Sequence, residues 1–580
     1  MSDFDSIKEK FSTYNPLIFD LVDIPQTDIL GLKDSVNFDV KFSNSICFPE
    51  INLGFHHFIH KTKDKMEIVD GFSSRKKVYQ VTSLFEKSID YKEQTDSGIP
   101  FDSIDKGITQ FIKSTKPDFP PLLNRAFLKM WEILVEFDLI EPVESFISSH
   151  LAEGPGSFIQ ATILYRELQS KLNKVKTLNK DGYYGVTLHS DHSHLLMQQN
   201  FIKYFDKETP KRLHIMETKS VKEIRDLYGG FKGKNTDKSS KIITNGDLTK
   251  LNTIIQFAGS KTIESFTKPS DLVTADGGFD WKRENLQEQE AYRLIFSEIV
   301  TALKIQKNGG NFVIKIFETF TKVTIKFIQL LRQVYNQVYL AKPYTSRISN
   351  SEKYIVCKGF VKSSISSKII NKLEEQIELM DKNSEYQIFD IFTNIQLSPK
   401  VYESYKLINQ EFTVKQYIGI NSIVQFINLD NYNGIEFNEY LDKQIIASQF
   451  WNEMFLNPKN FEKIAKFFSK FNFNKFKETF KISEISEDSE QIKSSETNEL
   501  DVSELKKSKI QSKLSRNKSK STKSKRVQKG GNQIGEINEI EEIEKTEEYQ
   551  NIYQDTNLSN SSDDLVGVLD NDIIDLNNIL

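Results

Sequence analysis

The sequence has 580 residues, a formal net charge of −4 and two cysteines. A chain of this length is expected to form two or three domains, because a single hydrophobic core stops growing at about 250–300 residues. Cys47 and Cys357 are too few for a disulfide framework or a cysteine-based zinc site, and no apolar stretch is long enough to span a bilayer. We therefore expect a soluble protein of a reducing intracellular compartment, cytoplasmic or nuclear, with no membrane partner. If the source is viral, the expected place is a cytoplasmic factory or the virion.

Residues 1–110 mix short strand-like and helix-like pieces without a clear period. Mixed short elements of both kinds are typical of a small α+β region. We interpret these residues as an N-terminal accessory module, which is either separate or a support for the residues that follow.

The pattern changes over residues 111–362, where strand-like runs alternate with helical stretches. Residues 287–306 and 322–335 carry apolar side chains at the spacing of helices that lie on a sheet. This alternation predicts an α/β fold, a Rossmann-like sheet with helices on both faces. Ligands of such sheets bind beyond the carboxyl ends of the strands. The strand-like runs are "ESFISSHLAE", "YYGVTLH", "KIITNGD", "DLVTADGG", "NFVIKIF", "QVYLAKP" and "KYIVCKGF".

Three further segments differ from this core in composition. Residues 205–240 are charged and contain glycines, which favours an insertion loop between strands. Residues 363–480 are rich in Phe, Ile and Lys at helical spacing and predict a C-terminal helical domain. Residues 481–580 place a basic block, 506–531, between acidic stretches. That composition buries too little apolar surface to fold and predicts a disordered charged tail.

A glycine-containing turn, "EGPGSF", follows the strand-like run that ends near Ala152. Gly154 and Gly156 permit a tight turn at a helix N-terminus, with Ser157 beside them, and we expect these residues to approach a cofactor. A side chain at Gly156 is expected to fill the space that a nucleoside would occupy. The dinucleotide-binding motif requires a third glycine where Ile159 stands, which favours a single-nucleoside cofactor over a nicotinamide. A turn with no ligand is the alternative.

Two other polar segments are ambiguous. Asp247 in "TNGDLT" either hydrogen-bonds the amine of an adenine or caps a helix N-terminus. His189, His192 and His194 in "LHSDHSH" have a spacing that suggests a metal, but no fourth ligand is in view. We interpret this stretch as a polar loop and expect no metal.

Four charged residues stand in apolar or strand-like contexts. Asp276 ends the apolar run "DLVTADGG", and Lys315 lies inside the strand-like run "NFVIKIF". Lys129 lies on an apolar helix and Glu352 precedes the last strand-like run. A lysine in such a strand is rarely buried without a partner, although an edge strand would let it reach solvent. Taken singly, Lys129 and Glu352 are typical of a solvated surface.

Together, these four residues carry a resemblance to a known family. Residues 121–360 resemble the FtsJ-like, S-adenosylmethionine-dependent RNA 2′-O-methyltransferases, and most of all the Adrift-type enzymes that methylate the mRNA cap. The resemblance lies in "AFLKMWEIL", "EGPGSF", "TADGGFD", "GGNFVIKIF" and "SNSEKYIVC". The order Lys129, Asp276, Lys315, Glu352 matches the Lys-Asp-Lys-Glu tetrad of that family.

The resemblance implies methyl transfer from S-adenosylmethionine to a ribose 2′-hydroxyl, with Lys315 as the base. Burial and the like charge of Lys129 are expected to lower the pKa of Lys315, whereas Asp276 and Glu352 oppose this. Asp276 is also expected to face the cofactor. The implied partner is RNA, in particular capped mRNA, and other capping or transcription proteins are further candidates. The alternatives are a ribosomal RNA substrate, or a non-catalytic RNA-binding or stimulatory subunit.

Overall fold

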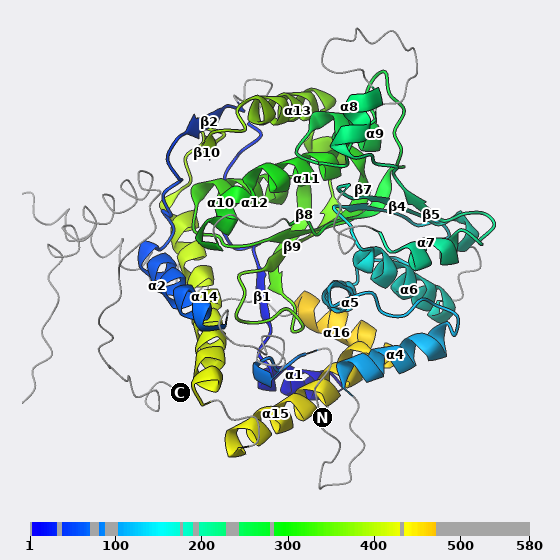
Figure 1. The fold of residues 1–580 in the computed structure, drawn as a ribbon, viewed down its shortest axis with the longest axis vertical. Coiled ribbons are helices and arrows are strands. Elements are labelled where there is room, and N and C mark those ends of the chain that lie inside the picture. The colour runs from blue at the N-terminus through cyan, green and yellow to red at the C-terminus, as the bar shows by residue number, and fades with distance from the viewer. Residues whose placement is uncertain are drawn as a thin grey trace, which may run out of the picture. The chain divides into compact units, whose positions relative to one another are not determined.

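The structure is a computed structural model, and Figure 1 shows its fold. The elements described below belong to the unit that spans residues Met1–Ile485. The predicted tail, residues 481–580, lies outside the described residues. None of the described helices is both long and apolar enough to cross a membrane. The structure describes residues 3–31, 38–69, 81–86, 103–173, 178–189, 197–227, 243–278, 284–429 and 434–470.

A mixed sheet of eight strands forms the centre of this unit, in the order β1-β8-β9-β7-β6-β3-β4-β5. The strands from β7 to β5 are parallel, β9 runs antiparallel between β7 and β8, and β1 adds an antiparallel edge. The strands are β1 (Leu17–Asp20), β3 (Ile147–Leu151), β4 (Gly182–Val186), β5 (Leu213–Ile215), β6 (Ser270–Ala275), β7 (Gln306–Ile316), β8 (Tyr335–Lys342) and β9 (Lys353–Phe360).

Helices cover both faces of the sheet, which confirms the predicted fold class. Side chains alternate along β7, so Phe312 and Ile314 join one hydrophobic core while Val313 joins the other. Both faces are therefore buried, as the continuous apolar run of this strand predicts. One core includes α9 (Leu251–Ala258), α11 (Tyr292–Ile305), α12 (Lys322–Val334) and α13 (Ser367–Lys382). The other includes α4 (Ile104–Thr115), α5 (Ala126–Phe137), α6 (Ser157–Leu172) and α7 (Gln199–Phe205).

The N-terminal residues are built into the same unit. Strand β1 pairs with β8, and β2 (Val40–Ser43) pairs with β10 (Gln387–Ile391). Among the described residues, α1 (Asp3–Thr13) and α2 (Leu53–Asp64) lie ahead of α4 in the chain. This pairing favours the second interpretation of residues 1–110, a support for the sheet.

The C-terminal region is mostly helical, as predicted. Apart from α13 and β10, it consists of α14 (Pro399–Leu429), α15 (Ile435–Phe455) and α16 (Pro458–Lys470). Trp451 of α15 lies buried and donates its indole N–H to Glu132 of α5 at 2.9 Å. Trp131 of α5 donates its indole N–H to the carbonyl of Phe455 at 2.7 Å. The C-terminal helices therefore complete the core beside α5.

Two assignments between β4 and β6 are wrong. The described part of "KIITNGD", residues 243–247, forms neither a helix nor a strand. The third strand is β5, which lies inside residues 205–240, the predicted insertion loop, and is followed by α8 (Val221–Leu227). Strand β5 has three residues between charged neighbours, so pairing with β4 stabilises it and no local pattern reveals it.

Candidate active site

The candidate site begins at the carboxyl ends of the adjacent parallel strands β3 and β6. Leu151 is in register with Ala275, and the N–H of Asp276 donates to the carbonyl of Leu151 at 3.4 Å. The glycine-containing turn after β3 and the carboxylate after β6 therefore leave the sheet at the same edge. This is the edge at which α/β sheets bind ligands.

Lys315 lies on β7 at this edge, and its ammonium contacts the carboxylate of Asp276. Its Nζ is 3.2 Å from Oδ1 of Asp276 and donates to the backbone carbonyl of Asp276 at 2.9 Å. Tyr354 of β9 donates its hydroxyl to the same Oδ1 at 3.2 Å. The Lys315 side chain is 13% exposed and that of Asp276 20%. The pair is thus partly shielded, and one side remains open to a ligand.

The other two charged residues form a second pair beside the first. Nζ of Lys129 is 2.7 Å from Oε1 of Glu352, and the hydroxyl of Ser346 donates to Oε1 at 2.9 Å. Lys315 and Val313 face the same side of the sheet, and α5 covers that side. Lys129 on α5 therefore lies on the same side as Lys315. The charge of Glu352 raises the pKa of Lys315, which shows that the two pairs are electrostatically coupled. The structure therefore brings all four predicted residues together.

The expected lowering of the Lys315 pKa is wrong for this structure. Burial lowers the pKa, but the carboxylates of Asp276 and Glu352 raise it by more, so the net shift is upward. Glu352 shows the complementary effect: burial opposes its ionisation, yet Lys129 and Lys315 lower its pKa to about 2. The cluster is therefore a balanced set of two ammonium and two carboxylate groups.

Sequence reasoning missed two buried glutamates at this site. Burial, and secondarily Asp276, raise the pKa of Glu298 of α11 to about 8. A side chain at Gly277 would collide with the carboxyl of Glu298, so this glycine is required for close packing. The signal in the sequence was a glutamate inside the apolar pattern of residues 287–306.

The second missed residue is Glu153, which opens the glycine-containing turn. Its Oε1 accepts the N–H groups of Phe158 at 2.9 Å and Ile159 at 3.0 Å, in the first turn of α6. Its Oε2 is buried and has no hydrogen-bond partner among the described residues. Burial and the nearby charge of Asp276 raise its pKa well above the ordinary value. The raised pKa favours the neutral form of this carboxyl beside Asp276, and Nδ1 of His150 lies 3.8 Å from Oε2.

The turn itself has the predicted position but not the predicted steric role. Gly154 donates its N–H to the hydroxyl of Thr187 at 3.2 Å, and Ser157 donates its hydroxyl to Asn124 at 2.9 Å. Gly156 has φ +114°, a conformation that favours glycine, and a Cβ there would lie 3.0 Å from the Met197 side chain. A side chain at Gly156 would therefore enter the protein core, and the expectation that it fills the nucleoside space is wrong.

Asp247 adopts a turn rather than a helix cap. Its Oδ1 accepts the N–H of Thr249 at 2.9 Å and the hydroxyl of the same residue at 2.7 Å. The preceding Asn245 accepts the N–H of His189 through its carbonyl at 2.7 Å, which holds this turn beside the end of β4. Asp247 thus lies on the same edge as the glycine-containing turn, and its role towards an adenine remains a prediction.

Of the histidine stretch singled out in the sequence, His192 and His194 lie outside the described residues. Side chains that could bind a metal ion gather elsewhere in the structure. Donor atoms of His56, His60 and Glu318 lie within 4.8 Å of one another. Lys63 pairs with Glu318, and His60 Nε2 is 2.9 Å from the same carboxylate. Because Lys63 already neutralises the carboxylate, we assign the cluster to holding α2 against the end of β7.

The sequence comparisons agree with this geometry. Residues 122–360 match the model of the family described as FtsJ-like methyltransferase. The chain therefore contains an FtsJ-like methyltransferase domain, and the tetrad, the glycine-containing turn and β3–β9 all lie inside it.

Three similar curated proteins are cap-specific mRNA 2′-O-methyltransferases. Over 124 residues, 21% of this chain and 14% of the relative, the chain is 37% identical to cap-specific mRNA (nucleoside-2′-O-)-methyltransferase 1A of Caenorhabditis briggsae. It is 33% identical over 243 residues to cap-specific mRNA (nucleoside-2′-O-)-methyltransferase 2 of Pongo abelii, with 41% of this chain and 27% of the relative covered. It is 29% identical over 251 residues to methyltransferase 1 of Dictyostelium discoideum, with 41% and 30% covered. The matches span less than a third of each relative.

Proposed function

We propose that this protein transfers a methyl group from S-adenosylmethionine to a ribose 2′-hydroxyl of RNA, at the 5′ cap of mRNA. The observation that carries the proposal is the cluster of Lys129, Asp276, Lys315 and Glu352 at the carboxyl edge of the sheet. The FtsJ-like domain supports methyl transfer, and the cap-specific relatives support the choice of substrate.

The residues around the cluster fit the expected cofactor. The turn containing Gly154 and Ser157, the carboxylate of Asp276 and the turn of Asp247 lie along one edge and would hold it. The buried Oε2 of Glu153 has no hydrogen-bond partner among the described residues there. When bound, S-adenosylmethionine supplies an electrophilic methyl group and a positive sulfonium charge, which opposes protonation of Lys315.

Each tetrad residue then has a distinct task. A ribose hydroxyl is a poor nucleophile until its proton is being removed, and Lys315 is the proton acceptor. Asp276 holds Lys315 at this edge through the 3.2 Å ion pair. Glu352 is held by Lys129 and Ser346, and its charge compensates the buried ammonium groups. Positioning and electrostatics therefore provide most of the catalysis.

The site of action follows from the substrate. Because mRNA is capped and modified inside the cell, we propose a nuclear or cytoplasmic location, or a viral factory or virion if the source is viral. Proteins of capping or transcription are the proposed partners. The two alternatives to this proposal are methylation of ribosomal RNA and a non-catalytic RNA-binding role.

The decisive experiment is methylation of defined RNAs by the full chain. Radiolabelled methyl donor is incubated with one RNA sequence bearing a cap or a 5′-hydroxyl, and with ribosomal RNA, and the labelled nucleotide is then mapped. We expect label on a 2′-hydroxyl near the cap of the capped RNA. Label on ribosomal RNA alone would overturn the cap assignment. RNA binding without any transfer would overturn the enzymatic assignment.

A further inference from the structure

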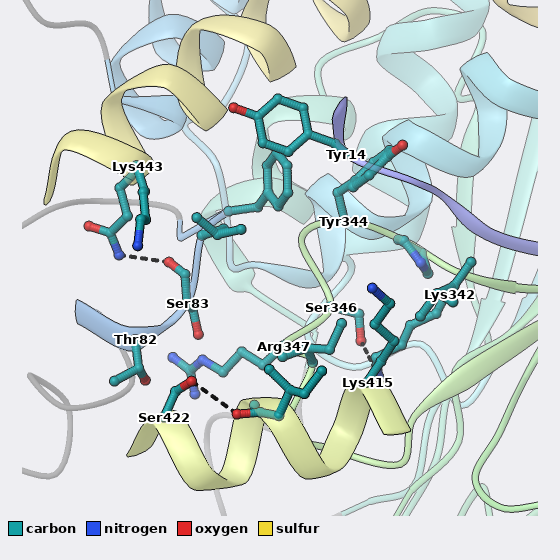
Figure 2. Close-up of a pocket in the computed structure, with 18 of the residues that line it drawn as sticks. Tyr14, Thr82, Ser83, Lys342, Tyr344, Ser346, Arg347, Lys415, Ser422 and Lys443 are labelled. Carbon is teal, nitrogen blue, oxygen red and sulfur yellow. Dashed lines mark hydrogen bonds between the residues drawn. The ribbon is translucent and has the colours of Figure 1, made fainter. Parts of the chain in front are cut away.

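Figure 2 shows a pocket whose lining includes Lys342 and Ser346, two residues that donate hydrogen bonds to Glu352 of the tetrad. It has a volume of about 390 Å³. Its walls come from the β8–β9 loop, α14, α15 and two N-terminal segments, residues 13–17 and 81–85. Except for Arg125 and residues 342–348, the lining lies outside the matched FtsJ-like segment. The flanking regions of this chain therefore build most of the pocket.

The lining carries an excess of positive charge. Arg125 and Arg347 share one carboxylate, Glu86, and Lys443 lies 3.9 Å from Glu439. No described carboxylate forms an ion pair with either of the remaining cations. The cationic side chains of the lining are Arg125, Lys342, Arg347, Lys415 and Lys443.

The two cations without an ion pair differ in burial. Lys342 is buried and donates only to neutral oxygens: the carbonyl and side chain of Asn350 at 2.9 and 2.7 Å, and the carbonyl of Glu352 at 2.8 Å. Lys415 is half-buried on α14 and projects towards Lys342 and Ser346 in Figure 2. A cation removed from water without a counter-charge favours the binding of an anion.

The pocket and the tetrad share side chains. Ser346 lines the pocket and donates its hydroxyl to Oε1 of Glu352. Lys342 lines it too and holds the backbone carbonyl of the same glutamate. A strand of RNA whose ribose lies at Lys315 therefore has its neighbouring nucleotides within reach of this pocket.

Aromatic rings form another part of the wall. The ring centroids of Phe85 and Tyr344 are 4.9 Å apart, and those of Tyr14 and Phe85 are 5.3 Å apart. The Tyr344 hydroxyl is buried and has no hydrogen-bond partner in the part of the chain that the structure describes. Aromatic rings next to cations suit a base and its phosphate, because bases stack on rings while phosphates pair with ammonium groups.

We propose that this pocket is an RNA subsite, which holds a nucleotide next to the ribose that is methylated. Its phosphate lies between Arg347 and Lys415, and its base lies against Tyr344 and Phe85. The inference rests on the proposed function and deepens it, since it assigns the flanking regions to holding the substrate strand. The chemistry recognised is a phosphate attached to a base, which comes either from the 5′-terminal phosphates or from an internal phosphodiester.

The test compares two charge reversals on one helix. Lys415→Glu places a carboxylate in the pocket, whereas Lys406→Glu changes a partly exposed lysine of α14 that pairs with Glu403 and does not line the pocket. We expect Lys415→Glu to raise the KM for RNA by about tenfold or more, which corresponds to one lost phosphate contact and a new repulsion. Its effect falls on KM more than on kcat, and cofactor affinity measured by calorimetry stays at the wild-type value.

Salt titration gives a second measurement. The slope of log affinity against log salt for a short single-stranded RNA should fall by about one unit in Lys415→Glu relative to Lys406→Glu. RNAs of one sequence with a cap, a 5′-triphosphate or a 5′-hydroxyl separate the two sources of phosphate. A penalty confined to the first two assigns the pocket to the terminal phosphates, and an equal penalty on all three assigns it to the chain.

Different results would contradict the RNA subsite and the proposed methyl-transfer function. If both variants shift the KM and the salt slope equally, the pocket does not contact RNA, whatever the wild-type enzyme methylates. If the wild type methylates none of the RNAs, the proposed function fails, and RNA binding measured by fluorescence anisotropy still decides the pocket. A Tyr344→Leu variant, which keeps an apolar side chain there, should raise the Kd for RNA by about 5- to 150-fold through loss of stacking.

Discussion

Lys315, which is partly buried, and Lys342, which is buried, show how neighbouring groups decide the pKa of an ammonium at the carboxyl edge of the sheet. Lys315 at the end of β7 faces the carboxylates of Asp276 and Glu352, and these raise its pKa despite burial. Lys342 at the end of β8 is also close to Glu352, but it donates to carbonyl, amide and hydroxyl oxygens. There burial dominates, and the pKa of Lys342 lies well below its ordinary value.

The comparison separates two functions within one corner of the molecule. The tetrad around Lys315 contains two carboxylates and two ammonium groups. Its charge is therefore balanced, and it can position a proton acceptor without a general attraction for anions. The Lys342 side leads into a pocket whose cations outnumber their carboxylates, which suits the phosphates of a substrate. Chemistry and strand binding thus lie side by side and share Glu352 and Ser346.

Replacing Lys315 is expected to have the largest effect on activity. Lys315→Met removes the proton acceptor, so single-turnover methyl transfer should slow by about 10²–10⁴-fold. Calorimetry should show that the cofactor still binds. The matched control is Lys307→Met, an exposed lysine on the same strand that pairs with Asp271. A Lys315→Met enzyme that keeps most of the wild-type rate would exclude Lys315 as the base.

Removing the carboxylate that faces Lys315 should move the pH dependence of the reaction. Asp276 raises the pKa of Lys315, so Asp276→Asn should lower the pH at which the rate is half-maximal by about 1–3 units. The plateau rate and the cofactor affinity should both fall, because the same carboxylate serves both. A pH–rate profile and calorimetry measure these effects. An unmoved profile would show that Lys315 is not the titrating group.

The Lys342 side of the comparison is tested by stability rather than rate. A lysine whose folded pKa is lowered binds fewer protons folded than unfolded, so the free energy of unfolding rises with pH up to the ordinary pKa of 10.5. The slope for one such group is at most about 1.4 kcal/mol per pH unit. Lys342→Met should flatten this rise in urea titrations from about pH 8 upward.

Lys315 provides the opposite control for that experiment. Its folded pKa is raised, so its contribution to stability is complete below pH 10.5 and is lost only as the pH rises further. Lys315→Met should therefore leave the slope below pH 10.5 as in the wild type. Equal slopes in the wild type and Lys342→Met would contradict the assignment of Lys342 as the uncompensated cation.

The smallest effect on turnover is expected from the charged tail. Deleting residues 481–580 removes the basic block and no member of the tetrad or the pocket. The turnover rate at saturating RNA should stay within about twofold, while RNA affinity weakens modestly and its salt dependence becomes shallower. A truncated protein that binds the cofactor but does not methylate saturating RNA would place the tail in the catalytic machinery.

The strands and site residues that could be predicted from the sequence are those that a local residue pattern reveals. The strand-like runs that became β3, β4, β6, β7, β8 and β9 each match a described strand, and the run of β7 is almost continuously apolar because that strand is buried on both faces. Lys315 and Asp276 could be identified because a charge in such a run needs a partner. Strand β5 and the pairing of β1 with β8 could not, because short edge strands depend on a neighbour far away in the sequence.

The sequence by itself determined the position of most strands along the chain, the glycine-containing turn and the identity of four charged residues with a shared chemistry. Only the tertiary structure decided the electrostatics, because a pKa depends on charges brought together from distant segments. It placed Asp276 and Glu352 against Lys315 and reversed the expected shift, and it buried Glu298 and Glu153 beside them. It also assembled the pocket from the N-terminal segments and α14 and α15, which no local pattern relates to the domain they adjoin.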